Sequence, residues 1–283
     1  MILAPLRGVT IRCFRRTFAA EIAAAGFTEA VTPFITATPG FDPLRDRELK
    51  GGESIALTPQ FISKDPAALR ECLVRIKAAG HATADLNAGC PFPMVRNKGR
   101  GSGLLRTPDV LRWLLEVGCE TMGEGRFSLK ARLGVERPDE LLKLMPLINE
   151  FPLRYIAVHA RTARQMYEGA CDMAVFRKVA AVSRIPVVYN GDAPLSGSPV
   201  PEGASDVMVG RAFLRALGER EDSARLLSRY IEASSEELSG ERPVLGRIKE
   251  LVSYWKDLPG WRRRWQIVKL ARSLDELQMA IKD

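Results

Sequence analysis

The chain has 283 residues, hydrophobic side chains at 46% of positions and a formal net charge of +8 at pH 7. These values indicate a soluble globular protein, either one large α/β barrel with an appendage or two ordinary domains. The five cysteines are widely spaced and form no CxxC pair, so neither a disulfide framework nor a metal site is indicated. With no long apolar run and no signal-peptide pattern, we expect a cytoplasmic protein with no membrane segment.

Short apolar runs alternate with longer amphipathic runs, which predicts a parallel sheet built from βα units. The predicted strands are residues 2–4, 28–31, 55–61, 84–87, 127–133, 155–159, 187–190 and 207–209. Eight such units predict a TIM (β/α)8 barrel over residues 1–217, with the active site on the loops that follow the strands.

The connection after the second predicted strand, residues 34–52, is long and irregular and contains Pro39, Pro43, Gly51 and Gly52. Long loops at the catalytic face of a barrel are often functional. The alternative is a disordered surface loop, and the sequence does not separate the two.

A glycine-rich and basic loop, residues 85–105, follows the fourth predicted strand and begins DLNAGCP. Its thiol, Cys90, lies between Gly89 and Pro91, which predicts a rigid turn. Close behind it lie four cations that could hold an anionic partner: Arg96, Lys98, Arg100 and Arg106. The other four cysteines fall in or beside helical stretches and are expected to be small buried hydrophobes.

Lys130 and Arg132 are two residues apart in the fifth predicted strand, so both side chains point into the barrel. A buried cation is costly unless an anion or a strong acceptor faces it, which favours a ligand at this point. The alternative is an internal salt bridge, for which the predicted strands offer only Glu29 and Asp85.

The last barrel connections differ from each other. The segment DAPLSGSPVPEGAS, after the seventh strand, has no helical periodicity, so we predict that its helix is missing or reduced to a turn. Gly210 and Arg211 open the helix after the eighth strand, where TIM barrels commonly bind a phosphate. The net positive charge also favours a polyanionic partner, although a merely basic surface would give the same total.

Residues 218–283 are charged and helix-periodic, which predicts a small C-terminal helical bundle of about four helices. A basic cluster lies between Trp261 and Trp265 and consists of Arg262, Arg263 and Arg264. It suits an RNA surface, through phosphate contact and base stacking. It equally suits a solvated helix face whose tryptophans lie in the core.

Six motifs together resemble the signature series of the FMN-dependent tRNA-dihydrouridine synthases, in the family's order along the barrel. They are LAPLRGVT, DLNAGCP with the ending GRGSGLL, KARLG, HARTARQMY, NGD and DVMVGRAFL. The family's usual HGRT reads HART here. The segment GRIKELVSYW, residues 246–255, most resembles the bacterial C subfamily.

The resemblance implies that FMN, reduced by NADPH, passes a hydride to C6 of a uracil ring in tRNA. A flavin supplies no proton to C5, so the reaction needs a positioned acid. Cys90 matches the family's catalytic cysteine. A nucleophilic or redox role would favour a partner histidine or second cysteine, and nothing nearby in sequence offers one.

The resemblance also assigns the remaining site residues. The residues implied to bind the cofactor are Ala4, Pro5, Leu6, Gln60, Lys130, His159, Asn190, Gly191, Asp192, Gly210 and Arg211. Gln60 is expected to bond the flavin's edge, and Asn87 and Arg132 to contact the uridine. The basic loop after Cys90 and the arginines at 262–264 would hold the RNA, with ribosomal RNA left open as a substrate. We expect a monomer.

Two alternatives stay open. The first is a flavin oxidoreductase that acts on a free pyrimidine or another small molecule, although the basic tail argues against it. The second is a non-catalytic RNA-binding protein that has lost FMN, because the short connection after Asp192 adjoins the phosphate loops.

Overall fold

The computed structural model describes residues 1–195 and 199–282. Over these residues, ten strands form one sheet in the order β3-β5-β6-β7-β8-β9-β10-β1-β2-β4, and all of the recorded pairings are parallel. The strands are β1 Ile2–Leu3, β2 Glu29–Val31, β3 Ile35–Thr36, β4 Ala56–Thr58, β5 Gln60–Ile62, β6 Ala84–Ala88, β7 Phe127–Gly134, β8 Ile156–Thr162, β9 Val187–Asn190 and β10 Asp206–Val209.

The sheet closes through the segment that contains Pro59. β4 pairs with β2 at one end of the strand order, and β5 pairs with β6 near the other. Only Pro59 separates β4 from β5, so one extended segment joins both ends. Proline has no N–H for the ladder, which accounts for the break between the two strands. The predicted TIM barrel is confirmed, with the predicted strand 55–61 observed as β4 and β5.

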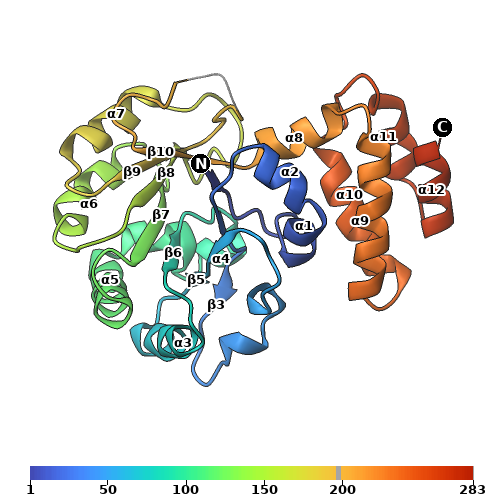
Figure 1. Cartoon of the computed structure of the whole chain (residues 1–283). Coiled ribbons are helices and arrows are strands. Elements are labelled where there is room, and N and C mark those ends of the chain that lie inside the picture. The colour runs from blue at the N-terminus through green and yellow to red at the C-terminus, as the bar shows by residue number, and fades with distance from the viewer. Residues whose placement is uncertain (196–198, 283) are drawn as a thin grey trace.

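Helices surround the strands, as Figure 1 shows. The barrel helices are α1 Arg12–Thr17, α2 Ala19–Ala24, α3 Pro66–Ala78, α4 Pro93–Arg96, α5 Pro108–Met122, α6 Glu140–Ile148, α7 Met173–Val182 and α8 Arg211–Glu219, with 3-10 turns η1 Pro43–Arg45, η2 Arg47–Leu49 and η3 Gly101–Arg106. The described residues between β9 and β10, 191–195 and 199–205, contain no helix, and residues 196–198 of this predicted connection lie outside the described residues.

Helix α3 shows how the sequence forms a barrel helix. The Asp65 side chain accepts hydrogen bonds from the N–H groups of Ala67 and Ala68, and Pro66 occupies the first helical position. Leu69, Cys72, Leu73 and Ile76 then recur at three and four residues and are fully buried. Cys13, Cys90 and Cys119 are also buried, whereas Cys171 is partly exposed.

The C-terminal helices form a bundle beside α1 and α8, at one side of the barrel (Figure 1). They are α9 Ser223–Glu237, α10 Glu241–Ser253, α11 Arg262–Val268 and α12 Leu274–Lys282. Trp255 is fully buried and its Nε1 donates to the Leu214 carbonyl of α8 at 2.6 Å. A Cβ on Gly218 would lie 2.5 Å from the Trp255 ring, so glycine is needed where the bundle meets α8.

Trp261 packs against Trp255 with ring centroids 4.6 Å apart and is 1% exposed. Its Nε1 donates to Ser223 Oγ at 3.1 Å. Trp261 is therefore a core residue of the bundle and is not available for stacking on an RNA base. Of the flanking arginines, Arg262 and Arg263 are exposed, and Arg264 lies over the Trp261 ring.

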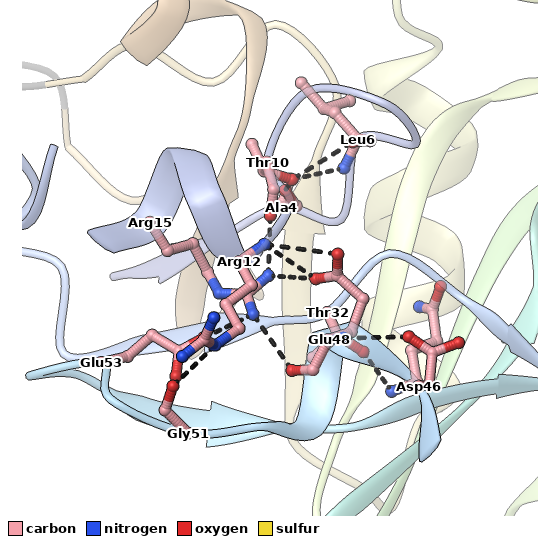
Figure 2. Close-up of polar contacts among 11 residues, drawn as sticks. Ala4, Leu6, Thr10, Arg12, Arg15, Thr32, Asp46, Glu48, Gly51 and Glu53 are labelled. Carbon is pink, nitrogen blue, oxygen red and sulfur yellow. Dashed lines mark hydrogen bonds and ion pairs between the residues drawn. The ribbon is translucent and has the colours of Figure 1, made fainter. Parts of the chain in front are cut away.

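Hydrogen bonds and ion pairs join the irregular segment 34–52 and Glu53 to α1, as Figure 2 shows. The guanidinium of Arg15, whose side chain is fully buried, donates to Glu48 Oε2 at 2.7 Å and to Glu53 Oε1 at 2.6 Å. The Arg12 amide also donates to Glu48, and Arg12 Nε donates to the Gly51 carbonyl at 2.7 Å. These contacts favour an ordered segment over the disordered loop that the sequence left open.

A second polar contact in Figure 2 shapes the loop after β1. Thr10 Oγ1 donates to the Ala4 carbonyl at 2.9 Å and accepts from the Leu6 amide at 2.8 Å. Thr10 is fully buried, so these bonds are shielded from water. The Thr10 side chain therefore holds the loop that carries Ala4, Pro5 and Leu6 in place.

We predict that Arg15→Met will lower the free energy of unfolding by about 3–5 kcal/mol, because it leaves two largely buried carboxylates without their cation. Urea denaturation followed by circular dichroism measures this. The triple variant Arg15→Met, Glu48→Gln, Glu53→Gln should recover much of the loss. As a control, Arg70→Met breaks the exposed Arg70–Glu120 pair and should leave the midpoint close to that of the parent. A parental midpoint in Arg15→Met would contradict the assignment.

Candidate active site

A cavity of about 700 Å³ opens at the carboxyl ends of the barrel strands. Most of the predicted site residues lie on its wall, on the loops after β1, β6, β9 and β10, at the ends of β6 and β9 and on the inward faces of β7 and β8. The predicted residues on the wall are Ala4, Pro5, Leu6, Asn87, Cys90, Lys130, Arg132, His159, Asn190, Gly191, Asp192, Gly210 and Arg211. The barrel topology therefore brings together segments that are up to about 200 residues apart in the chain.

Some predicted residues lie elsewhere. Gln60 is fully buried below the wall, and both of its polar ends are bonded within the protein, so its position does not favour the expected contact with a flavin. The predicted RNA-contacting cations also lie off the wall. They are Arg96, Lys98, Arg100, Arg262, Arg263 and Arg264.

Cys90 lies on the cavity wall in a tightly constrained loop. Its amide donates to Asn87 Oδ1 at 2.8 Å, and its carbonyl accepts from the Ser102 amide at 3.1 Å. Gly101 has φ +57°, and a Cβ there would lie 2.8 Å from the Cys90 Cβ. A glycine at this position thus lets η3 close against the cysteine.

Burial raises the pKa of the Cys90 thiol, and it outweighs the opposite effects of the Phe92 amide and the nearby cations Arg7, Arg132 and Lys130. The thiol is therefore protonated at neutral pH. A protonated thiol is a weak nucleophile and an available proton donor.

Lys130 and Arg132 are the two inward cations of β7. Lys130 Nζ donates to Asn190 Oδ1 at 2.9 Å, and Asn190 Nδ2 in turn donates to the Met208 carbonyl at 2.7 Å. Burial, followed by the charge of Arg132, lowers the pKa of Lys130 to about 8. The Lys130 ammonium is thus held next to the cavity with a neutral acceptor as its partner.

The Arg132 guanidinium is held by backbone carbonyls. It donates through Nε to Gly89 at 3.0 Å and through Nη1 to Thr162 at 2.9 Å and Met166 at 2.6 Å. Burial lowers its pKa to about 10. Among the described residues neither inward cation forms an ion pair with Glu29 or Asp85, which favours the ligand interpretation over the internal salt bridge.

His159, on β8, lies beside Arg132 in the register of β7 and β8, and two further arginines follow along the chain. Burial, and then the charges of Arg132 and Lys130, lower the pKa of His159 well below its ordinary value, so the imidazole is neutral. Its Nδ1 is buried with no hydrogen-bond partner among the described residues. Arg161 and Arg211 both pair with the Asp192 carboxylate. A carboxylate has no proton to donate to an anion, so the Asp192 side chain does not bind a phosphate itself. It orients the guanidiniums of Arg161 and Arg211 instead.

The start of α8 suits an anion. Gly210 precedes the helix, and a Cβ there would lie 3.1 Å from the Ala4 Cβ, so the two loops meet closely. The first amides of a helix have no intrahelical partner, and Arg211 and Ala212, which begin α8, line the cavity. These amides and the guanidinium fit a phosphate group, and the cavity volume fits an aromatic cofactor.

Two tyrosines of the wall are missing from the sequence prediction. The guanidiniums of Arg132 and Arg211 lie 5.3 and 5.0 Å from the centroid of the Tyr167 ring. Tyr254, from the end of α10, also lines the cavity. Both tyrosines belong to motifs singled out above, HARTARQMY and GRIKELVSYW, and membership of those motifs is the signal that could have identified them.

The site defines a class of TIM-barrel protein in which free helix amides and an arginine that suit a phosphate line the same cavity as a protonated thiol. Residues 2–217 match the family described as dihydrouridine synthase (Dus), and the chain belongs to that family. It is 31% identical over 219 residues to tRNA-dihydrouridine synthase B of Vibrio cholerae, covering 75% of this chain and 66% of that protein. It is also 31% identical over 221 residues to the probable tRNA-dihydrouridine synthase of Rhodobacter capsulatus, with the same coverages.

The chain thus spans about 66% of the length of these relatives. Several relatives are named as type B synthases, from Vibrio, Pseudomonas and Salmonella species, so the expected likeness to the C subfamily is not supported. Among solved structures, an old yellow enzyme homologue from Zymomonas mobilis is similar in fold, with a TM-score of 0.56 and 10% identity over 76% of this chain and 85% of that one. None of the helices within residues 1–195 and 199–282 is long and apolar enough to cross a membrane.

We predict that alkylation of Cys90 by iodoacetamide will have a pH midpoint above that of an ordinary cysteine, because burial raises its pKa and the thiolate is the reacting species. Mass spectrometry of the modified peptide measures the rate in a Cys171→Ser background. The partly exposed Cys171, measured in a Cys90→Ser background, is the control. A Cys90 midpoint at or below about 8.5 would contradict the protonated thiol.

Proposed function

We propose that this protein reduces uridine in tRNA to 5,6-dihydrouridine, using FMN in the barrel cavity and NADPH as reductant. The observation that carries the proposal is the protonated thiol of Cys90 on the wall of a cavity with two buried cations, Lys130 and Arg132. Membership of the dihydrouridine synthase family and the names of the relatives support it.

The residues present fit FMN. The first amides of α8 and the Arg211 guanidinium suit its phosphate, and the loop of Ala4, Pro5 and Leu6 offers apolar side chains to the ring system. Lys130 offers a cation where negative charge develops on a reduced flavin. Bound FMN, once reduced, supplies a hydride to C6 of the uracil.

Cys90 completes the reduction at C5. Its Sγ–H donates a proton to C5 as the C5=C6 double bond becomes a single bond, and the resulting thiolate regains a proton from solvent. The raised pKa keeps the proton on sulfur until the base needs it. The tight loop of Asn87, Gly101 and Ser102 holds the thiol in place while it acts.

The target base is turned out of the folded RNA to reach the cavity, because a stacked or paired base cannot enter it. The cations outside the cavity would then contact the RNA backbone, which supplies affinity without sequence preference. They are Arg96, Lys98, Arg100, Arg262, Arg263 and Arg264. Because Trp261 is buried, we assign the arginines at 262–264 to phosphate contact and not to base stacking.

We predict that Cys90→Ala will keep bound flavin and NADPH-dependent flavin reduction but will lose dihydrouridine formation by at least about 100-fold, the loss expected for a general acid. Flavin absorbance follows the first activity and mass spectrometry of the RNA follows the second. Cys171→Ala is the matched control and should modify RNA at the parental rate. Parental modification by Cys90→Ala would show that another group donates the proton.

We also predict that FMN affinity will fall as the pH rises through about 8, because Lys130, whose pKa is lowered to about 8, then loses its charge. Fluorescence titration of FMN at several pH values between about 7 and 9 measures this. Lys130→Met has no charge to lose and should bind FMN more weakly, with no pH dependence in this range. The same pH dependence in parent and variant would exclude Lys130 as the source.

The decisive test is mass-spectrometric mapping of dihydrouridine in RNA from cells with and without the gene. It identifies the RNA and the uridine position, and a loss confined to ribosomal RNA would replace tRNA as the substrate. A colourless purified protein that takes up no FMN would instead support an RNA-binding protein without flavin. Equal reduction of free nucleoside and RNA would support a small-molecule oxidoreductase.

A further inference from the structure

A line of hydrogen-bonded side chains runs from the barrel interior to the Cys90 loop. At its inner end the Asp85 carboxylate, which is fully buried, accepts from Ser128 Oγ at 2.6 Å and from Gln60 Nε2 at 2.7 Å. Gln60 Oε1 accepts from Asn87 Nδ2 at 2.7 Å. Asn87 Oδ1 then accepts from the Cys90 amide at 2.8 Å and from its neighbour, the Gly89 amide, at 3.1 Å.

Every hydrogen bond along this line points the same way, toward Asp85. An ionised carboxylate has no proton to donate, so Gln60 must turn its NH2 group toward Asp85 and its carbonyl toward Asn87. Asn87 must then turn its NH2 group toward Gln60 and its carbonyl toward the Cys90 loop. The charge on Asp85 therefore determines which atom of Asn87 faces the catalytic loop.

Protonation of Asp85 removes this constraint. A carboxylic acid can donate to Gln60, which favours rotation of the Gln60 amide and then of the Asn87 amide. Asn87 would present its NH2 group to the amides of Gly89 and Cys90, and two donors do not form a hydrogen bond. The loop would lose both of its amide hydrogen bonds to the Asn87 side chain.

We propose that ionised Asp85 is a positioning residue for Cys90, acting through Gln60 and Asn87, and that its protonation loosens the Cys90 loop. The catalytic consequence rests on the function proposed above. The control of loop order by Asp85 does not, because it depends only on the hydrogen bonds of the folded chain.

The surroundings of Asp85 place its titration in an accessible pH range. Burial raises the pKa of Asp85 to about 6, against the opposite effects of Ser128, Gln60 and the charge of Lys130 on β7. The charged and titratable groups that face it from the neighbouring strands are Lys130, Glu29 of β2, and Arg154 and Tyr155 before β8.

Tyr155 and Lys130 keep their charge states as Asp85 titrates. Glu29 is paired with Arg154 through two contacts of 2.8 Å. Burial raises the pKa of Tyr155 well above its ordinary value, so it stays neutral, and Lys130 changes charge only near pH 8. The protonated fraction of Asp85 therefore rises as the pH falls through about 6.

Hydrogen exchange of the Gly89 and Cys90 amides, measured by NMR and corrected for the intrinsic pH dependence of exchange, tests the proposal. In the parent protein, protection of these amides should fall by about tenfold between pH 7.5 and pH 5. Amides of β8 report global stability and should keep their protection. If the protection of the Gly89 and Cys90 amides does not change with pH, the proposal is overturned.

Three variants separate positioning from a merely structural role. Gln60→Met removes the hydrogen bonds to Asp85 and Asn87 without adding charge, so the Gly89 and Cys90 amides should have low protection at both pH values. If this variant keeps the parental pH dependence, the proposal fails. Asp85→Asn should likewise remove the pH dependence. Ser128→Ala keeps the line but removes a bond to the carboxylate, so the midpoint should move to higher pH. An unchanged midpoint in Ser128→Ala, which also decides the matter if the other variants do not fold, would overturn the role of Asp85.

The pH dependence of uridine reduction is measured as a separate test. If the protein reduces uridine, the parental rate should fall below about pH 6 while Ser128→Ala falls at a higher pH, in step with the exchange midpoints. If no uridine reduction is found, the proposed function fails while the exchange data still judge the line from Asp85 to Cys90.

Discussion

The barrel depends on one constraint, which is that the segment Ala56–Ile62 pairs on both sides of Pro59. The residues before the proline form β4, which pairs with β2, and the residues after it form β5, which pairs with β6. Closure makes the carboxyl ends of all of the strands converge, which is what gathers distant polar residues around one cavity. It also fixes Gln60, the residue after Pro59, directly opposite Asp85 in the register of β5 and β6.

Charge is arranged in layers along the barrel interior. Glu29 pairs with Arg154 near the amino ends of the strands, Asp85 lies next, and Lys130 and Arg132 lie at the cavity. The acids are satisfied by neighbours within the protein, whereas the two cations have only neutral partners among the described residues. Glu29 is thus paired with a cation, Asp85 has neutral partners, and the cavity end is left electropositive, where an anionic or electron-rich ligand would bind.

The C-terminal bundle is part of the site as well as an appendage. Trp255 anchors it to α8, whose first turn lines the cavity, and the preceding residue, Tyr254, lines the cavity itself. The predicted boundary near residue 217 falls inside α8, so this helix serves both parts of the chain. The wall of the cavity is thus formed both by the barrel and by the C-terminal helices that are expected to hold RNA.

The sequence by itself determined the eight predicted strands, the constrained turn at Cys90 and the inward direction of Lys130 and Arg132, but not β3, which lies in the segment expected to be irregular. Each follows from local rules: apolar runs of strand length, a cysteine between glycine and proline, and the two-residue period of a strand. Only the tertiary structure decided that Gln60 bonds Asp85 and Asn87, that Asp192 holds Arg161 and Arg211, and that Tyr167 lies under two guanidiniums. Those partners are set by strand register and loop approach between residues far apart in the chain, and no local pattern of the sequence encodes which neighbour a polar side chain will meet.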